Sequence, residues 1–199
     1  MPMTEICIIR HGETDWNAQF RIQGRSDIPL NETGRRQASI TAGHLESESW
    51  DIIYSSPLRR ALETARTISK AVGVKTITTE ADLLESDFGV AEGMTIDERK
   101  IKYPDRNLIP GAEKLDEIKS RAVDIITRIS ERHAGKRIII VSHACFIMEV
   151  LGAFSSGKID GRKTKLKNLS MTLLTRGEDW DIPWYNRSAM EMETAATSQ

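Results

Sequence analysis

Two histidines stand at the ends of short apolar segments. His11 follows the segment Ile6–Ile9 and Arg10, and His143 follows the segment Arg137–Ser142. A neutral imidazole offers a nucleophilic nitrogen near pH 7 and, unlike a serine hydroxyl, needs no base to remove a proton first. Of the two, His11 beside Arg10 is the natural nucleophile for attack on a negatively charged phosphoryl group.

Further polar groups follow two other apolar segments. Arg60 lies a few residues after the segment 51–54, in the first turn of an expected helix, and Glu85 lies after the segment 74–78. An arginine fork holds phosphate through two parallel hydrogen bonds, and a helix N-terminus adds amide donors and positive dipole. A departing alkoxide needs a proton, and Glu85 is the candidate donor, which then activates water for a second step. Together these residues indicate a site where a small anion undergoes chemistry.

The elements that must position these residues alternate between strand and helix patterns. The strands expected are 6–9, 51–54, 74–78, 137–142, 168–175 and 180–185, and the helices are 31–45, 57–72, 113–133 and one that follows His143. Ser56 is expected to cap the second helix, with Pro57 in its first position and Gly73 at its end. This alternation predicts a largely parallel sheet covered by helices on both faces. Ligands of such sheets bind outside the carboxyl ends of the strands, where these polar groups would meet.

Length and composition describe an ordinary globular chain. The 199 residues carry 28 Lys and Arg against 29 Asp and Glu, a net charge of −1 that argues against nucleic-acid and membrane-surface partners. Cys7 and Cys145 are too few for a disulfide framework and suit a reducing cytosol. No apolar run approaches the roughly 20 residues of a membrane span. We expect a cytoplasmic protein with one domain over residues 1–187 and a flexible tail over 188–199, either a monomer or a homodimer.

Four motifs give a family resemblance. In chain order they are RHGETDWN at 10–17, SSPLRRALETA at 55–65, LLESDFGVAEG at 83–93 and VSHACF at 141–146. Together they resemble the histidine phosphatase (phosphoglycerate mutase-like) superfamily. The resemblance implies an α/β fold of three layers, with a mixed, mostly parallel sheet, helices on both faces, and no required cofactor or metal.

The resemblance also implies a role for each matching residue. His11 is the histidine that becomes phosphorylated, and Glu85 is the proton donor. The phosphate pocket around His11 is formed by Arg10, Arg60 and His143, with Asn17, Gln23 and Gly24 as further phosphate contacts. The implied activity is hydrolysis of a small phosphorylated metabolite, a phosphomonoester, through a phosphohistidine intermediate.

Two other functions remain open within this family. A phosphoglycerate mutase is disfavoured because the segment 20–30 resembles the phosphatase form. The stretch after Gly93 is also short and has Glu98-Arg99-Lys100 where mutases have an arginine pair. A non-catalytic phosphate-ligand-binding module is disfavoured because such modules usually lack the nucleophile or an arginine.

Several residues have competing interpretations. Glu13 and Asp15 either orient His11 or cap the loop, and Lys114 is either a solvated helix residue or a contact for a second anionic group of the substrate. The basic run 158–167 is either a solvated loop or the rim of the substrate entrance. A cysteine-dependent phosphatase is excluded, because the arginine it needs six positions after the cysteine is absent after Cys7 and Cys145. A metal site at the two histidines lacks a third ligand at suitable spacing.

Overall fold

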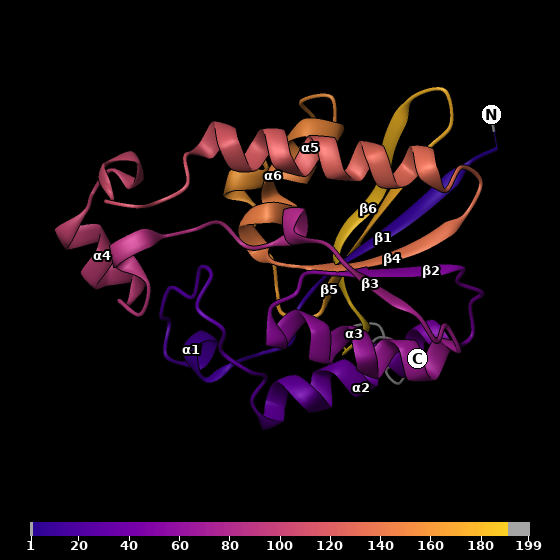
Figure 1. Ribbon diagram of the computed structural model, residues 1–199, viewed down its shortest axis with the longest axis horizontal. Helices are drawn as coiled ribbons and strands as arrows, with labels where there is room; N and C mark the ends of the chain where they lie inside the picture. Colours follow the sequence, from indigo (N-terminus) through magenta and orange to yellow (C-terminus); the bar gives the residue numbers. More distant parts are fainter. Residues whose placement is uncertain (1, 191–199) are drawn as a thin grey trace, which may run out of the picture.

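The computed structural model describes residues 2–190, which are organised around a six-stranded sheet (Figure 1). The strands are β1 (Thr4–Arg10), β2 (Ile52–Ser55), β3 (Ile77–Thr79), β4 (Arg137–Ser142), β5 (Ser170–Arg176) and β6 (Trp180–Ser188). Their order is β3-β2-β4-β1-β5-β6. The first four strands in this order are parallel, whereas β5 pairs antiparallel with β1 and β6 pairs antiparallel with β5. The predicted mixed, mostly parallel sheet is confirmed.

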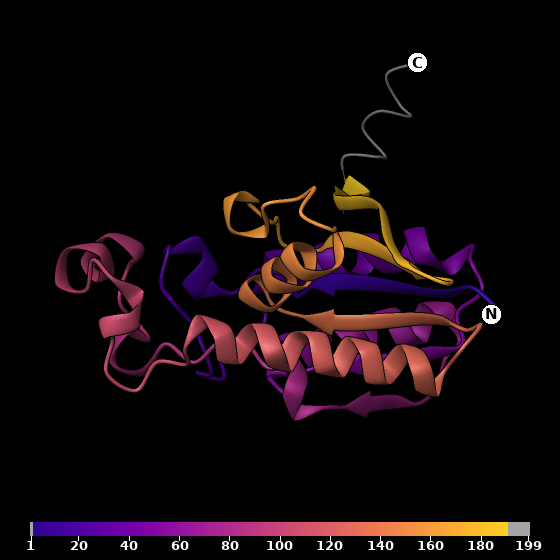
Figure 2. The same cartoon turned by 90° about the horizontal axis from the view of Figure 1, so that it is seen from above.

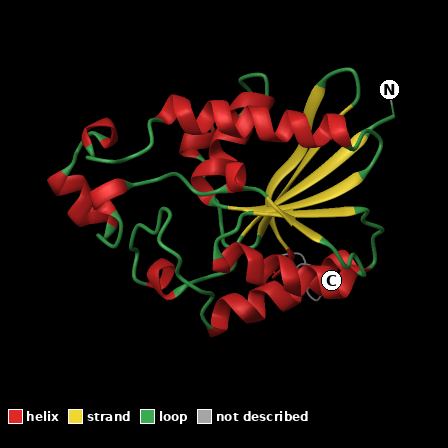
Figure 3. Cartoon of the chain, viewed as in Figure 1, coloured by secondary structure: helices red, strands yellow, loops and turns green. Residues whose placement is uncertain are grey.

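Helices cover both faces of this sheet. The α-helices of the described residues are α1 (Asp15–Ala18), α2 (Glu32–Glu46), α3 (Arg59–Val72), α4 (Ile96–Lys102), α5 (Leu115–Arg132) and α6 (Ala144–Phe154). Figure 3 shows α2 and α3 below the sheet and α5 and α6 above it, which gives the three predicted layers. The short helices α1 and α4 lie beyond the carboxyl ends of the parallel strands (Figures 1 and 2). They therefore flank the edge where a ligand is expected.

The alternation of side chains along the strands divides the core into two halves. In β1, Ile6 and Ile8 pack in the cluster that contains the apolar face of α5 and α6. Cys7 and Ile9 point the other way and pack with residues of α2 and α3. Successive strand residues face opposite sides of a sheet, so an uninterrupted apolar strand is stable only when both faces are covered.

Some element boundaries differ from the sequence prediction. Ser56 is not the cap of α3, because Leu58 holds that position and the helix begins at Arg59. Gly73 ends the helix in the left-handed conformation, as predicted. The sequence predicts a flexible tail from residue 188, but Ser188 ends β6 and Ala189 is fully buried. Residues 191–199 of that expected tail lie outside the described residues. Among the helices of residues 2–190, none combines the length and apolar character required to cross a membrane.

Candidate active site

The register of β1 and β4 brings the two histidines together. Arg10 pairs with Ser142 at the ends of these parallel strands, and the amide of His11 donates to the carbonyl of Ser142 at 3.0 Å. His11 and His143 therefore leave adjacent strands at the same level, and their ring centroids are 5.1 Å apart. Both side chains are buried, with 3% and 0% of their surface exposed.

His11 has one nitrogen committed to the backbone. Its Nδ1 donates to the carbonyl oxygen of Gly12 at 2.7 Å. Since a carbonyl can only accept, this bond keeps the proton on Nδ1 and leaves the Nε2 lone pair available. Burial lowers the pKa of His11 well below its usual value, and the positive charges of Arg60 and Arg10 lower it further. The imidazole is therefore neutral near pH 7, as a nucleophile must be.

Arg60 links the site to the turn at 23–27. Its side chain is fully buried, and its two terminal nitrogens donate to the carbonyls of Gly24 and Ser26, each at 2.7 Å. Gly24 has φ of 51°, in the left-handed region, and the side chain of Glu92 accepts hydrogen bonds from the turn amides of Arg25 and Ser26. Burial lowers the pKa of Arg60 to about 10. The guanidinium therefore stays charged at neutral pH.

Arg10 supplies a second guanidinium at the end of β1, on a side chain that is only partly buried. One of its terminal nitrogens donates to the carbonyl of Leu166 at 2.7 Å. Burial lowers the pKa of Arg10, and the charge of Glu85 opposes that shift. Arg10 and Arg60 both act electrostatically on His11, so the nucleophile faces two positive charges.

His143 is held by the residue that follows β2. Its Nε2 lies 2.8 Å from the hydroxyl oxygen of Ser56, and both side chains are fully buried. The amide of Ser56 donates to the carbonyl of Val141 at 3.0 Å, so the third parallel strand also delivers a polar group to this edge. Burial and the charge of Arg60 lower the pKa of His143 well below its usual value. The sequence signal for Ser56 was its place directly after a strand, although a helix cap was expected there.

Glu85 lies at the N-terminus of α6. Its carboxylate accepts hydrogen bonds from the amides of Ser86 at 2.9 Å and Cys145 at 3.1 Å. The preceding chain is anchored to β4 and α5, because Ser142 donates to the carbonyl of Leu83 and Arg121 donates to that of Leu84. These contacts fix the carboxyl group among the charges of Arg10 and Arg60, on both of which it acts electrostatically.

Two of the expected phosphate contacts, Asn17 and Gln23, are connected to the site by hydrogen bonds. Asn17 is connected through the side chain of Asn168, and Gln23 through its backbone carbonyl. Asn168 donates to the carbonyl of His11 at 3.0 Å and approaches the side-chain oxygen of Asn17 at 3.4 Å. Gln23 is buried, and its carbonyl accepts from the amide of Ser26 in the turn that presents Gly24 to Arg60. Asn168 was not predicted as a site residue; only its position at the start of the expected strand 168–175 signalled it.

Three buried side-chain nitrogens around His11 have no hydrogen-bond partner among the described residues. They are Nε of Arg10, Nε of Arg60 and Nδ1 of His143. Buried polar groups are nearly always hydrogen-bonded, and two guanidinium N–H groups with an imidazole match the oxygens of a phosphoryl group. Among residues 2–190 there is no cluster of three or more His, Cys, Asp or Glu placed to hold a metal ion. The arrangement is suited to binding a phosphoryl group beside a nucleophilic imidazole.

The family follows from comparison with known proteins. A model of the histidine phosphatase superfamily (branch 1) matches residues 6–187. The chain belongs to this superfamily. Because the matched range spans nearly the whole chain and contains all four motifs, the predicted family is confirmed.

Relatives of this histidine phosphatase carry both phosphatase and mutase names. It is 40% identical over 185 residues to the uncharacterized phosphatase PhoE of Bacillus subtilis (strain 168), covering 92% of this chain and 95% of that protein. It is 34% identical to the probable phosphoglycerate mutase GpmB of Photorhabdus laumondii, covering 97% and 93%. Among solved structures, phosphoserine phosphatase of Entamoeba histolytica in complex with 3-phosphoglyceric acid has a TM-score of 0.81 at 28% identity, covering 93% and 98%.

The structure also decides between the competing interpretations of nearby residues. Glu13 accepts from the side chain of Asn31 at 3.0 Å, which ties the first loop of this histidine phosphatase to α2 and does not orient the imidazole. Burial raises the pKa of Cys145 to about 12, so its thiol stays protonated. In the basic run, Lys165 and Lys167 line a cavity together with Arg10, which supports the rim interpretation for these two lysines.

Proposed function

We propose that this histidine phosphatase hydrolyses phosphomonoesters of small metabolites through a phosphohistidine on His11. The observation that carries the proposal is the neutral, buried imidazole whose Nε2 is left available by the bond from Nδ1 to Gly12. In the first step the Nε2 lone pair attacks phosphorus, and the bond from phosphorus to the alcohol oxygen breaks. In the second step water attacks phosphorus, the P–N bond breaks and phosphate is released.

The positive groups around His11 would stabilise the transferring phosphoryl group. Charge spreads over its three equatorial oxygens in the transition state, and preorganised donors at those oxygens are the main source of catalysis in phosphoryl transfer. Arg10, Arg60 and His143 supply such donors through nitrogens that have no other acceptor among the described residues. Ser56 can donate its hydroxyl proton to Nε2 of the neutral His143, which keeps the imidazole proton on Nδ1 and makes that nitrogen a donor.

Glu85 would serve both steps by moving one proton. It donates this proton to the departing alkoxide, then takes a proton from the attacking water. The amides of Ser86 and Cys145 hold its carboxyl group in one orientation, so the same oxygens face both the leaving group and the water that replaces it. No step in this scheme requires a metal or an organic cofactor.

The same site supports small phosphorylated metabolites as the substrate class. A neighbour of known structure binds 3-phosphoglyceric acid, and the site of this chain supplies donors for one phosphoryl group. We also propose a cytoplasmic location, because the cysteines Cys7 and Cys145 are free.

A phosphate-release screen over a panel of metabolite phosphomonoesters tests this function. We expect the wild-type chain to release inorganic phosphate from at least one of them, and the variant His11→Ala to release none. A phosphoglycerate mutase would leave the phosphate on an isomerised product. A non-catalytic module would bind phosphomonoesters without converting them. Either of these results would overturn the proposal.

A further inference from the structure

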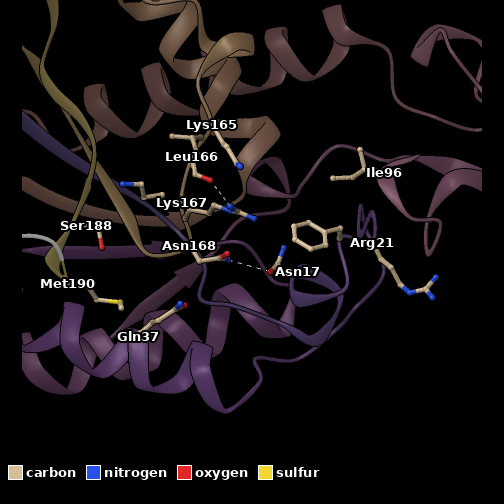
Figure 4. Close-up of a pocket in the computed structure, with 12 residues that line it drawn as sticks. Asn17, Arg21, Gln37, Ile96, Lys165, Leu166, Lys167, Asn168, Ser188 and Met190 are labelled. Carbon is tan, nitrogen blue, oxygen red and sulfur yellow. Dashed lines mark hydrogen bonds between the residues drawn. The ribbon is translucent and has the colours of Figure 1, made fainter. Parts of the chain in front are cut away.

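A cavity of about 740 Å³ opens beside the proposed phosphate site (Figure 4). Arg10 and Asn17 lie in its wall, so the cavity is continuous with two of the proposed phosphate contacts. Pockets for metabolite-sized ligands measure about 300–1,000 Å³. The volume is therefore sufficient for the alcohol portion of a phosphomonoester, whose phosphoryl end would lie at His11 next to the cavity, because His11 itself is not a lining residue.

One wall of the cavity is apolar and solvent-exposed. Phe20 and Ile96 both line it, with 71% and 41% of their surface exposed. Contiguous exposed apolar surface rimmed by polar residues is a feature of ligand-binding grooves, as of other interaction sites. The two residues come from separate elements, the loop after α1 and the start of α4, yet they meet at this cavity.

The backbone holds Phe20 in an unusual conformation that displays its ring. Its φ is 56°, a left-handed value that a bulky non-glycine residue rarely adopts. The Phe20 amide donates to the carbonyl of Asn17 at 3.0 Å, and its carbonyl accepts from the amide of Ile96 at 2.9 Å. Strained residues of this kind are concentrated at ligand-binding positions. The apolar wall is therefore built on the same loop as Asn17.

Basic residues also line the cavity, namely Arg10, Arg21, Lys165 and Lys167. Figure 4 shows the side chain of Lys165 extending into the space between Leu166 and Ile96. Among the described residues that line the cavity there is no Asp or Glu. An anionic group of a ligand would therefore meet Lys165 and Arg10 without a competing carboxylate.

We infer that this cavity selects phosphomonoesters whose alcohol portion has an apolar body and a second anionic group. The apolar body would pack on Phe20 and Ile96, and the second anion, a carboxylate or another phosphate, would face Lys165. This inference rests on the proposed function, because it assigns the non-phosphate end of the same substrate.

Three aryl and alkyl substrates separate the contribution of the apolar body from that of the second anionic group. Phenyl phosphate has an apolar body alone, 4-carboxyphenyl phosphate adds a second anionic group, and glycerol phosphate has neither feature. The measurement is kcat/KM for each substrate, compared as ratios within each variant, so that any general loss of activity cancels.

Three variants and two matched controls use these substrates. For Phe20→Ala we expect the preference for phenyl phosphate over glycerol phosphate to fall about tenfold, the scale of one lost apolar contact in a pocket. Phe20→Leu should retain part of it. Leu108→Ala is the control, because Leu108 is also 71% exposed but lies outside the cavity.

For Lys165→Ala we expect the preference for 4-carboxyphenyl phosphate over phenyl phosphate to fall about threefold, the scale of an exposed ion pair. Added salt should reduce that preference in the wild type, because exposed charge pairs are screened. Lys163→Ala is the control; Lys163 lies on the same loop, pairs with Asp160 and does not line the cavity.

The outcomes separate this inference from the proposed function. Turnover of all three substrates with ratios unchanged in Phe20→Ala and Lys165→Ala would overturn the inference and leave the phosphatase activity standing. Absence of turnover by the wild type on every phosphomonoester would overturn both. If the controls Leu108→Ala and Lys163→Ala lost the same substrate preferences to the same extent, the cavity would not be the origin of those preferences and the inference would be refuted.

Discussion

The two buried histidines should make the stability of this protein strongly dependent on pH. The pKa values of His11 and His143 are lowered well below 6.5 in the fold, mainly by burial. As the pH falls below 6.5, the unfolded chain therefore binds protons at these positions and the folded chain does not. Stability is then lost with decreasing pH, because protonation favours the unfolded state.

The size of this effect follows from the usual histidine pKa of about 6.5. A histidine that stays neutral in the fold costs about 2 kcal/mol of stability between pH 7 and pH 5, and two cost about 4 kcal/mol. Carboxylates contribute little in this window because their unfolded pKa values lie near 4. Replacement of His11 and His143 by asparagine removes both titrating groups and their contribution to the pH dependence.

Urea denaturation at pH 7 and pH 5, in buffers without phosphate, gives the free energy of unfolding for each variant. We expect the wild type to lose about 4 kcal/mol more between the two pH values than the double variant His11→Asn/His143→Asn. Equal losses in the wild type and the double variant would refute the assignment of neutral, buried histidines.

Two further predictions concern the positioning of His143 and the close packing of the first loop against α2. Ser56→Ala removes the hydroxyl bonded to His143, so kcat should fall about tenfold, which is the scale of one hydrogen bond at a buried group. Ser56→Thr keeps a hydroxyl and should keep most of the activity. Steady-state kinetics test this prediction, and an unchanged kcat in Ser56→Ala would contradict it. In Gly34→Ala the added Cβ would meet the carbonyl oxygen of Glu13 at 2.1 Å, so the unfolding free energy should fall by about 1–3 kcal/mol. Gly43→Ala on the same helix, with nothing within 4 Å of its Cβ, should be neutral or stabilising in the same urea assay.

The layers of the fold could be predicted because each element carries its own periodic signal. β4 is uninterrupted and apolar, and α5 has a regular apolar face, so their types do not depend on distant residues. The strand-end positions of His11 and His143 then implied their proximity. Parallel neighbours place their carboxyl ends at one edge, and the 5.1 Å between the rings agrees with this.

Contacts between distant segments could not be predicted in this way. Ser56 was expected to cap α3, but its hydroxyl instead contacts His143, 87 residues away. Asn168 reaches the carbonyl of His11 across 157 residues, which depends on the antiparallel pairing of β5 with β1. The display of Phe20 also depends on tertiary structure, because its left-handed conformation is stabilised by the start of α4 and has no local sequence signal.

In the proposed mechanism the phosphoryl group passes through His11. Rapid acid or base quenching of the enzyme during turnover of a labelled phosphomonoester tests it most directly. We predict a protein-bound label that is lost in acid and retained in base, that maps to His11 and that is absent from His11→Ala. Full turnover by His11→Ala, or a label mapped to another residue, would contradict the account.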